Sequence, residues 1–322
     1  MSKSSKRLSF WIIAAIIVLL VCLPFITPSR MVLDYVIRLA AFAVFATSLN
    51  FLVGYGGMVS FGHAMFFGAG AYAFGLLIQK GGVSVPLAIV GTLGFCALVA
   101  VVIGAICVQL KEIYFAFLTL AFQMLFYSII LTWTSLTGGD QGLMGGIRRE
   151  PFLGIDLGQY LHLYWFACTV AIVCMLVMWY VLSSPFGNTL RMTRDNAHRA
   201  QFLGVNVWKV RLYAFVLAGC IAGASGIIMA LFVSGAYPEF AYWTMSGEGI
   251  FMIMMGGINN FFGPLVGAGL LLLFNDVIGR VTEYHGAVLG VVILIFALGF
   301  RRGVTDFVLQ LFNRQYTKGE SS

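Results

Sequence analysis

The stretch that decides the fold is WIIAAIIVLLVCL, residues 11–23. It is continuously apolar, whereas a strand of a transmembrane β-barrel alternates apolar and polar residues over ~10 positions. The run therefore excludes a barrel and predicts an α-helix in a membrane. Its basic flank is similar to that of a signal peptide, but the apolar run at about 8–26 is long for one and lacks a small-residue cleavage site. We therefore expect a retained membrane span.

Comparable apolar runs recur along the whole chain. Its 322 residues are 61% hydrophobic and only 10% charged, against roughly 25% charged residues in soluble domains. We expect spans at about 8–26, 31–53, 59–79, 85–108, 113–133, 161–183, 212–233, 244–262, 263–280 and 284–300. Glycines interrupt the runs at 59–79 and 244–262, so either can be a broken or re-entrant helix. The predicted fold class is all-α: a polytopic membrane helical bundle with about 10 transmembrane segments (8–10), in a single domain over residues 1–322.

Basic residues predict the orientation of these spans. The net charge is +7, and most Lys and Arg residues fall in three clusters: Lys3, Lys6 and Arg7; Arg191, Arg194, Arg199, Lys209 and Arg211; and Arg301, Arg302, Arg314 and Lys318. Because cytoplasmic loops are enriched in Lys and Arg, we expect both termini and the loop 184–211 to be cytoplasmic, and the loop 134–160 to be extracytoplasmic. The clusters do not form the aromatic-interleaved basic surface of a nucleic-acid-binding protein, so membrane lipid is an expected partner and nucleic acid is not.

Residues 54–70, GYGGMVSFGHAMFFGAG, share only their glycine spacing with a phosphate-binding loop. Where such a loop needs Lys and then Ser or Thr, this chain has His63 and Ala64. We therefore expect no ATP hydrolysis by this chain, and we interpret the glycines as places where helices pack closely or break. His63 is either a hydrogen-bonded packing residue or a proton relay or substrate ligand. The six cysteines lie in apolar segments without a C-x-x-C spacing, so no disulfide, metal site or cofactor is expected.

Few charged side chains fall within the predicted spans. Asp34 and Arg38 are four residues apart, as are Asp276 and Arg280. This spacing places both members on one helix face, so we expect each pair to form a local ion pair. Glu248 has no cation nearby in the sequence; it either meets a partner from another helix or faces a polar translocation path.

The loop 184–211, SPFGNTLRMTRDNAHRAQFLGVNVWKVR, is amphipathic as well as basic. Asp195 and Asn196 are residue types that cap a helix N-terminus, and Gly204 is typical of the residue that follows a helix. We expect a short helix between them, through Ala200 and Leu203. Such a helix can dock into a groove of another protein; the alternative is a plain basic loop on anionic lipid.

Two glycine-rich stretches echo each other, GGMVSFGHAMFFGAG at 56–70 and GGINNFFGPLVGAG at 256–269. Both run from Gly-Gly through Phe-Gly to Gly-Ala-Gly, with unequal gaps. Transporter halves often repeat in this way around a central path, although glycine-rich membrane helices also resemble one another by composition alone.

Four motifs in order resemble the membrane permeases of ABC importers for branched-chain amino acids, in particular the LivM-like branch. They are LNFLVGYGGMVSFGHAMFFGAGAY; YFAFLTLAFQ with SLTGGDQGL; FGNTLRMTRDNAHRAQFLGVNVWKVRLYAFVLAGCIAGASG; and MIMMGGINNFFGPLVGAGLL. The resemblance covers about residues 45–300. It implies a non-catalytic subunit of the bacterial inner membrane. It also implies a homologous second permease, two cytoplasmic ATPase subunits and an extracytoplasmic substrate-binding protein as partners.

The same resemblance implies roles for individual residues. The residues assigned to a coupling helix that contacts the ATPases are Arg191, Arg194, Asp195, Ala200 and Gly204. The candidates for the translocation path are Gly54, Gly56, Gly57, Ser60, Gly62, His63, Glu248, Gly256 and Gly257. Importer permeases at large show Glu-Ala-Ala-x-x-x-Gly in the coupling helix. This chain keeps Ala-x-x-x-Gly from Ala200 to Gly204, but it has Arg199 where the pattern has its first alanine, and it has no Glu.

The cargo implied by the resemblance is a branched-chain amino acid, and relatives of this kind also carry urea, short amides or aromatic acids. The alternative from another class is an ion-coupled secondary transporter or a channel. That alternative needs a coupling-ion site within the spans.

Overall fold

The computed structural model describes residues 24, 29–110, 112–143, 146–147, 149, 152, 154–281, 284–299 and 303–305. Within these residues the regular structure is helical, and the extended pairings are isolated bridges. The all-α prediction is confirmed for this part of the chain. Apart from Pro24, the first predicted span at 8–26 lies outside the described residues.

The helices follow the predicted spans closely. In chain order they are α2 (Arg30–Asn50), the π-helix η1 (Phe51–Tyr55), α3 (Ala64–Gln79), α4 (Val85–Cys107), α5 (Glu112–Thr132), α6 (Thr134–Thr137), the 3-10 helix η2 (Gly139–Gln141), α7 (Tyr160–Ser183), α8 (Pro185–Asp195), α9 (Ala197–Phe202), α10 (Val207–Val233), the 3-10 helix η3 (Pro238–Ala241), α11 (Trp243–Gly256), α12 (Gly263–Val281) and α13 (His285–Gly299). The loop predicted at 184–211 is therefore mostly helical, and α10 begins five residues earlier than expected.

Six helices of the described part are long and apolar enough to cross a membrane: Arg30–Tyr55, Val85–Cys107, Ile113–Thr132, Tyr160–Ser183, Val207–Val233 and Gly263–Val281. Shorter apolar helices lie at Ala64–Gln79 and Gly286–Phe296. The two segments that glycines interrupt, 59–79 and 244–262, form helices of only 16 and 14 residues. The chain is thus a multi-pass helical membrane protein.

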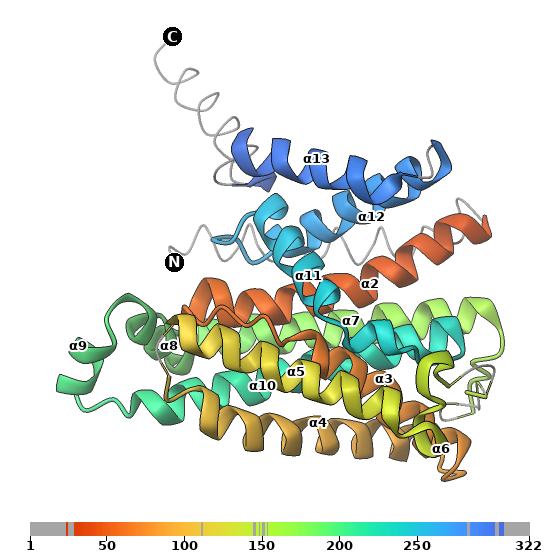
Figure 1. The fold of residues 1–322 in the computed structure, drawn as a ribbon, viewed down its shortest axis with the longest axis horizontal. Coiled ribbons are helices and arrows are strands. Elements are labelled where there is room, and N and C mark those ends of the chain that lie inside the picture. Colours follow the sequence, from red (N-terminus) through yellow and green to blue (C-terminus); the bar gives the residue numbers. More distant parts are fainter. Residues whose placement is uncertain are drawn as a thin grey trace.

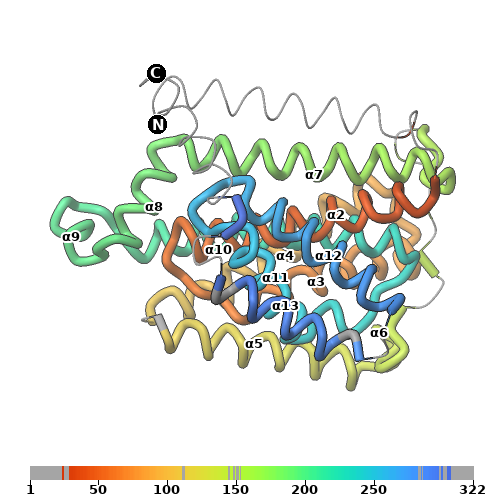
Figure 2. Tube along the Cα trace, turned by 90° about the horizontal axis from the view of Figure 1, so that it is seen from above, coloured from red at the N-terminus to blue at the C-terminus, as the bar shows by residue number. Residues whose placement is uncertain are grey.

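The long helices run along the long axis of the molecule (Figure 1). Viewed from above, α7 lies along one side and α5 along the other, with α2, α3 and α10 between them (Figure 2). α12 and α13 form a separate layer, and α11 crosses from that layer towards the main bundle (Figure 1). α8 and α9 project from one end of the bundle, and α6 lies at the other end (Figures 1 and 2).

Small residues allow α10 to contact α3 backbone to backbone. A Cβ on Gly70 would collide with the backbone of Gly223, and a Cβ on Gly226 would collide with the carbonyl of Phe67. The lipid tails are as apolar as the helix surfaces, so the hydrophobic effect does not drive helices together in a membrane. Helices there associate through close backbone contacts of this kind. The prediction that the glycines of this region permit close packing is confirmed at these positions.

The ion pair in the spans differs from the prediction. Arg38 of α2 pairs with Asp276 of α12 through two hydrogen bonds of 2.9 and 2.6 Å. The predicted local pairs, Asp34 with Arg38 and Asp276 with Arg280, are wrong. The two helices pack together, and a two-point guanidinium–carboxylate bond is stronger than the single contact that neighbours on one helix make.

Arg149 ties the loop between η2 and α7 to the bundle. Its guanidinium donates to the carbonyls of Leu231 and Phe232 at 3.0 and 2.9 Å, near the last turn of α10. The carbonyls of a last helical turn have no partner within the helix, so the arginine satisfies them. Partial burial lowers the pKa of Arg149, but an arginine remains charged at physiological pH.

Candidate functional site

The helical structure is interrupted between η1 and α3, at residues 56–63, and we call this interruption, together with η1, the first glycine break. α2 passes into the π-helix η1, Gly57 then adopts a φ of +67°, and helical structure resumes at Ala64. π-Helical turns are rare and occur frequently at functional sites. Glycine is required at position 57 because other residues seldom adopt this backbone conformation.

Two further glycines of the break let other segments approach. A Cβ on Gly62 would collide with the carbonyl of Thr119 in α5. A Cβ on Gly54 would lie 2.7 Å from the carbonyl oxygen of Ile258, in the loop between α11 and α12. The break is therefore packed against two other parts of the chain, as the interpretation of its glycines predicted.

The second glycine break has the same local form. α11 ends at Gly256, Gly257 adopts a φ of +116°, and α12 begins at Gly263. In both breaks the second glycine of the Gly-Gly pair has a positive φ and a new helix follows. The echo in the sequence therefore corresponds to a repeated local structure, and the contact of Gly54 with Ile258 places the two breaks side by side.

Buried polar side chains hold the start of α3. The hydroxyl of Ser246, in α11, accepts a hydrogen bond from the backbone of Ala64 at 2.9 Å and donates to Gln123 at 2.9 Å. The Gln123 amide in turn donates to the carbonyl of Ala241 at 3.0 Å. Ser246 thus caps α3 from another helix. Neither Ser246 nor Gln123 was predicted; the only signal was a polar residue inside an apolar run.

His63 lies within this buried region. Its side chain is fully buried, its Nε2 is 2.8 Å from the hydroxyl of Ser48, and its ring packs against Phe45 with centroids 5.5 Å apart. Among the described residues, His63 Nδ1, Ser60 Oγ and the side-chain amide of Asn50 are buried without a hydrogen-bond partner. Unpaired polar atoms of this kind are costly in a membrane, which makes them candidates for a water or cargo contact.

Glu248 lies on α11, between Ser246 and the second break. Its side chain is partly exposed, and within the described part of the chain it has neither an ion pair nor a hydrogen bond. The next residue, Gly249, packs on Phe45 and Leu49 of α2. The sequence left two alternatives for Glu248, a partner on another helix or a place on a polar translocation path. The described residues provide no such partner.

α8 and α9 form a helical hairpin within 184–211, in which α9 is the expected short helix and α8 is an additional helix that the sequence did not predict. Asn196 caps α9 by accepting the backbone N–H of Arg199 at 2.9 Å, and Gly204 follows the helix with a φ of +82°. Both predictions are confirmed. Phe202 is 91% exposed and Leu203 is 66% exposed, so the tip of the hairpin is apolar. Ala200 is buried in the turn and accepts a hydrogen bond from Val205.

The hairpin contacts the first break directly. Arg194 of α8 donates a hydrogen bond to the carbonyl of Gly54, and the guanidinium of Arg191 lies over the ring of Tyr55 at 5.1 Å. A cation above an aromatic face is attracted by the negative face of the ring. Asp195 pairs with Arg194 at 3.0 Å on the surface. Residues predicted separately for coupling and for the path therefore meet at η1, where Tyr55 is a contact that the sequence did not predict.

Comparison with known proteins identifies a family and several relatives. Residues 31–297 match the family described as "Branched-chain amino acid transport system / permease component". The chain is 23% identical to the high-affinity branched-chain amino acid transport system permease protein LivM of Escherichia coli (strain K12), over 91% of this chain and 74% of the relative. It is 29% identical to the autoinducer 2 import system permease protein LsrC of Salmonella paratyphi B, over 65% of this chain and 59% of the relative. No solved structure matches the chain significantly.

The matched region runs from the start of α2 into α13, and so includes both glycine breaks and the α8–α9 hairpin. The chain belongs to the family of permease components of branched-chain amino acid transport systems.

Proposed function

We propose that the chain is the membrane-spanning, non-catalytic subunit of an ATP-driven importer for branched-chain amino acids. The observation that carries the proposal is the contact of Arg194 and Arg191 with η1. It links a basic hairpin at one end of the bundle to the break that follows α2. A force on the hairpin is thereby delivered to the place where the helical path of α2 and α3 is least continuous.

The partners follow from the surfaces of the hairpin and of the opposite end. The apolar tip formed by Phe202 and Leu203, flanked by Arg199, suits a groove in one of two cytoplasmic ATPase subunits, and the second permease would contact the other. The residues assigned to this coupling are Arg191, Arg194, Asp195, Ala200 and Gly204. A homologous second permease completes the assembly, and the loop 134–160 provides the docking surface for a substrate-binding protein. This arrangement requires both termini to be cytoplasmic, with about 10 spans in one domain.

The path runs along the two breaks and α11. Its lining candidates are Gly54, Gly56, Gly57, Ser60, Gly62, His63, Glu248, Gly256 and Gly257. The buried polar atoms around His63 and the partly buried acid Glu248 on α11 support this choice, because each is costly in a membrane unless a polar ligand meets it. ATP-driven closure of the ATPases would then switch the breaks between two packings, as in other rigid-body transitions.

The test is uptake by the assembled complex in proteoliposomes. With ATP on the ATPase side and no ion gradient, labelled leucine, isoleucine or valine is expected to accumulate against its gradient. Urea, short amides and aromatic acids, offered in the same assay, test the alternative cargoes. Accumulation that needs an ion gradient and proceeds without the ATPase subunits would contradict the proposal and favour a secondary transporter.

A further inference from the structure

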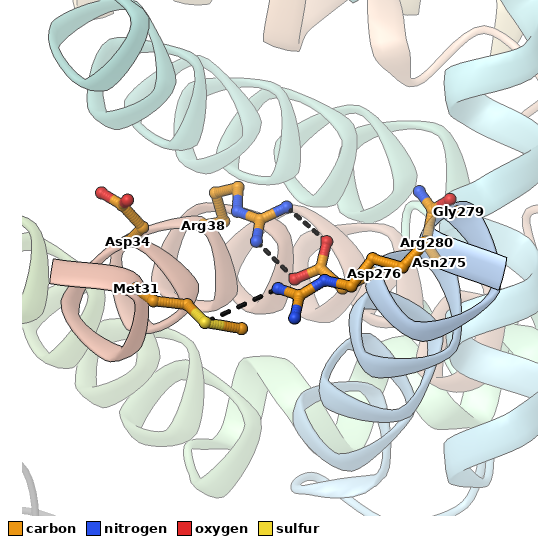
Figure 3. Close-up of a pocket in the computed structure, with 7 residues that line it drawn as sticks. All are labelled: Met31, Asp34, Arg38, Asn275, Asp276, Gly279 and Arg280. Atoms are coloured by element: carbon orange, nitrogen blue, oxygen red, sulfur yellow. Dashed lines mark hydrogen bonds and ion pairs between the residues drawn. The ribbon is translucent and has the colours of Figure 1, made fainter. Parts of the chain in front are cut away.

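The end of the bundle opposite the α8–α9 hairpin carries a charged pocket between α2 and α12. η1, at the end of α2, contacts the hairpin, so the start of α2 lies at the far end. The pocket there has a volume of about 500 Å³, within the range of small-molecule sites. Figure 3 shows its lining, with side chains of α2 facing side chains of α12.

The ion pair between Arg38 and Asp276 forms one rung across these two helices. Asp34 lies four residues before Arg38, and Arg280 four residues after Asp276, so each is displaced by about one turn, ~6 Å, along its helix. Because the two helices run antiparallel across the rung, both displacements point outward. Asp34 and Arg280 therefore lie about one turn beyond the ion pair, towards the end of the bundle opposite the hairpin, and we call these two opposite charges the second rung.

The second rung is open. Among the described residues, Asp34 makes no ion pair or hydrogen bond, and the partner that Arg280 contacts is the sulfur of Met31 at 3.6 Å, a weak acceptor. In Figure 3 the carboxylate of Asp34 stands apart from the guanidinium of Arg280, which lies beside Met31, and both residues line the pocket. A carboxylate and a guanidinium that line one pocket without pairing leave one site for a cation and another for an anion.

We propose that this pocket binds the ammonium and carboxylate groups of an α-amino acid at the outer entrance, which rests on the amino-acid cargo proposed above. Asp34 accepts from the ammonium, and Arg280 donates to the carboxylate in the two-point geometry that guanidinium groups favour. Two aspartates and two arginines line the pocket, so their charges sum to zero. That balance suits a zwitterion, whereas an anion would meet the aspartates and a cation the arginines.

The side-chain amide of Asn275 also lines the pocket. An amide both donates and accepts hydrogen bonds, so it can serve either end of the zwitterion. The inner pair of Arg38 and Asp276 is already satisfied and holds the two helices in place. The recognition therefore falls on Asp34 and Arg280.

The experiment measures binding by the permease in its assembled complex, in lipid nanodiscs and without ATP. The probes are L-leucine, 3-methylbutan-1-amine, which lacks the carboxylate, and 4-methylpentanoate, which lacks the ammonium. We expect leucine to bind at least about tenfold more tightly than either analogue, because each analogue loses one charge-assisted interaction.

Two variants assign the two ends. Arg280→Gln is expected to bind leucine no better than the amine, and Asp34→Asn to bind leucine no better than the acid. Both should raise the KM of ATP-driven uptake and leave the number of molecules imported per ATP unchanged. Arg30→Gln, which removes a cation at the same end outside the pocket, is the matched control and should change neither.

Three outcomes would overturn the inference. Leucine affinity and discrimination that are unchanged in both pocket variants, with uptake still driven by ATP, would remove the inference and leave the proposed function standing. No leucine binding, together with stabilisation by phosphatidylethanolamine that both variants lose, would assign the same chemistry to a lipid headgroup. Equal loss in Arg30→Gln would show a general charge effect. Because binding is measured without ATP, uptake that does not depend on ATP would count against the proposed function alone.

Discussion

The two glycine breaks have the same local form but are held in different ways. At the first break, side chains from the α8–α9 hairpin reach η1: Arg194 bonds to the carbonyl of Gly54, and Arg191 covers Tyr55. At the second break the close contact is between backbones alone, because Gly256 lies against Gly263; the first break has such a contact too, of Gly62 with Thr119, beside its arginine contacts. The side chains of Arg191 and Arg194 can change rotamer when the hairpin moves, whereas backbone segments in direct contact cannot shift without separating their helices.

The difference is that the first break has side-chain links to the hairpin, in addition to its backbone contacts, and the second break has backbone contacts. The second break fixes α11 to α12 and supports the first through the contact of Ile258 with Gly54. The first break receives the hairpin that projects from the bundle (Figure 1). Substitutions at the second break should therefore cost stability, and substitutions that remove the hairpin's contacts with the first break should cost coupling while the fold survives.

The largest effect is expected for Gly256→Ala. The new Cβ would collide with the backbone of Gly263, which cannot move aside without separating α11 from α12. Overpacking of this severity costs about 3 kcal/mol, and thermal unfolding of the purified protein in detergent would show it. Gly247→Ala in the same helix is the control: its Cβ meets nothing within 4 Å, so stability should stay equal or rise by about 0.5–1 kcal/mol. Equal losses in the two variants would contradict the account.

An intermediate effect is expected for Gly57→Ala. The left-handed backbone costs about 1–2 kcal/mol for alanine, and the Cβ would lie 2.7 Å from Cγ of Arg194, displacing it from η1. Gly82→Ala has a similar backbone cost, since Gly82 has a φ of +57°, but no neighbouring atoms within 4 Å. Both variants should lose similar stability, and only Gly57→Ala should import less substrate per ATP hydrolysed. The same import ratio in both would rule out a special role for the contact.

The smallest effect is expected for Arg191→Gln. It removes the cation above Tyr55, an interaction of about 0.5–1 kcal/mol at exposed sites, so uptake should fall roughly two- to fivefold. Arg191→Lys keeps the charge and should retain part of the activity. A lysine variant as impaired as the glutamine variant would indicate that the shape of arginine matters and not its charge over the ring.

The sequence predicted what depends on local pattern. The apolar runs predicted the helices, Asn196 and Gly204 predicted the ends of α9, and the Gly-Gly echo predicted a similarity that the backbone confirms. It could not predict the partner of Arg38, since a local spacing of four residues says nothing about the helix that packs alongside. Arg194 and Gly54 are 140 residues apart in the sequence. No sequence motif predicts a hydrogen bond from a guanidinium to a distant backbone carbonyl.

The central claim is that the hairpin drives the first break through Arg194. Its most direct test is the number of substrate molecules imported per ATP hydrolysed by the complex containing Arg194→Gln. The matched control is Arg149→Gln, which removes a guanidinium from backbone carbonyls at the opposite end. A hydrogen bond from a charged group is worth about 1.5–3 kcal/mol, so Arg194→Gln should lower the ratio at least about tenfold with the complex intact. The control should lower only stability. An unchanged ratio in Arg194→Gln, with the ATPase subunits still bound, would contradict the account.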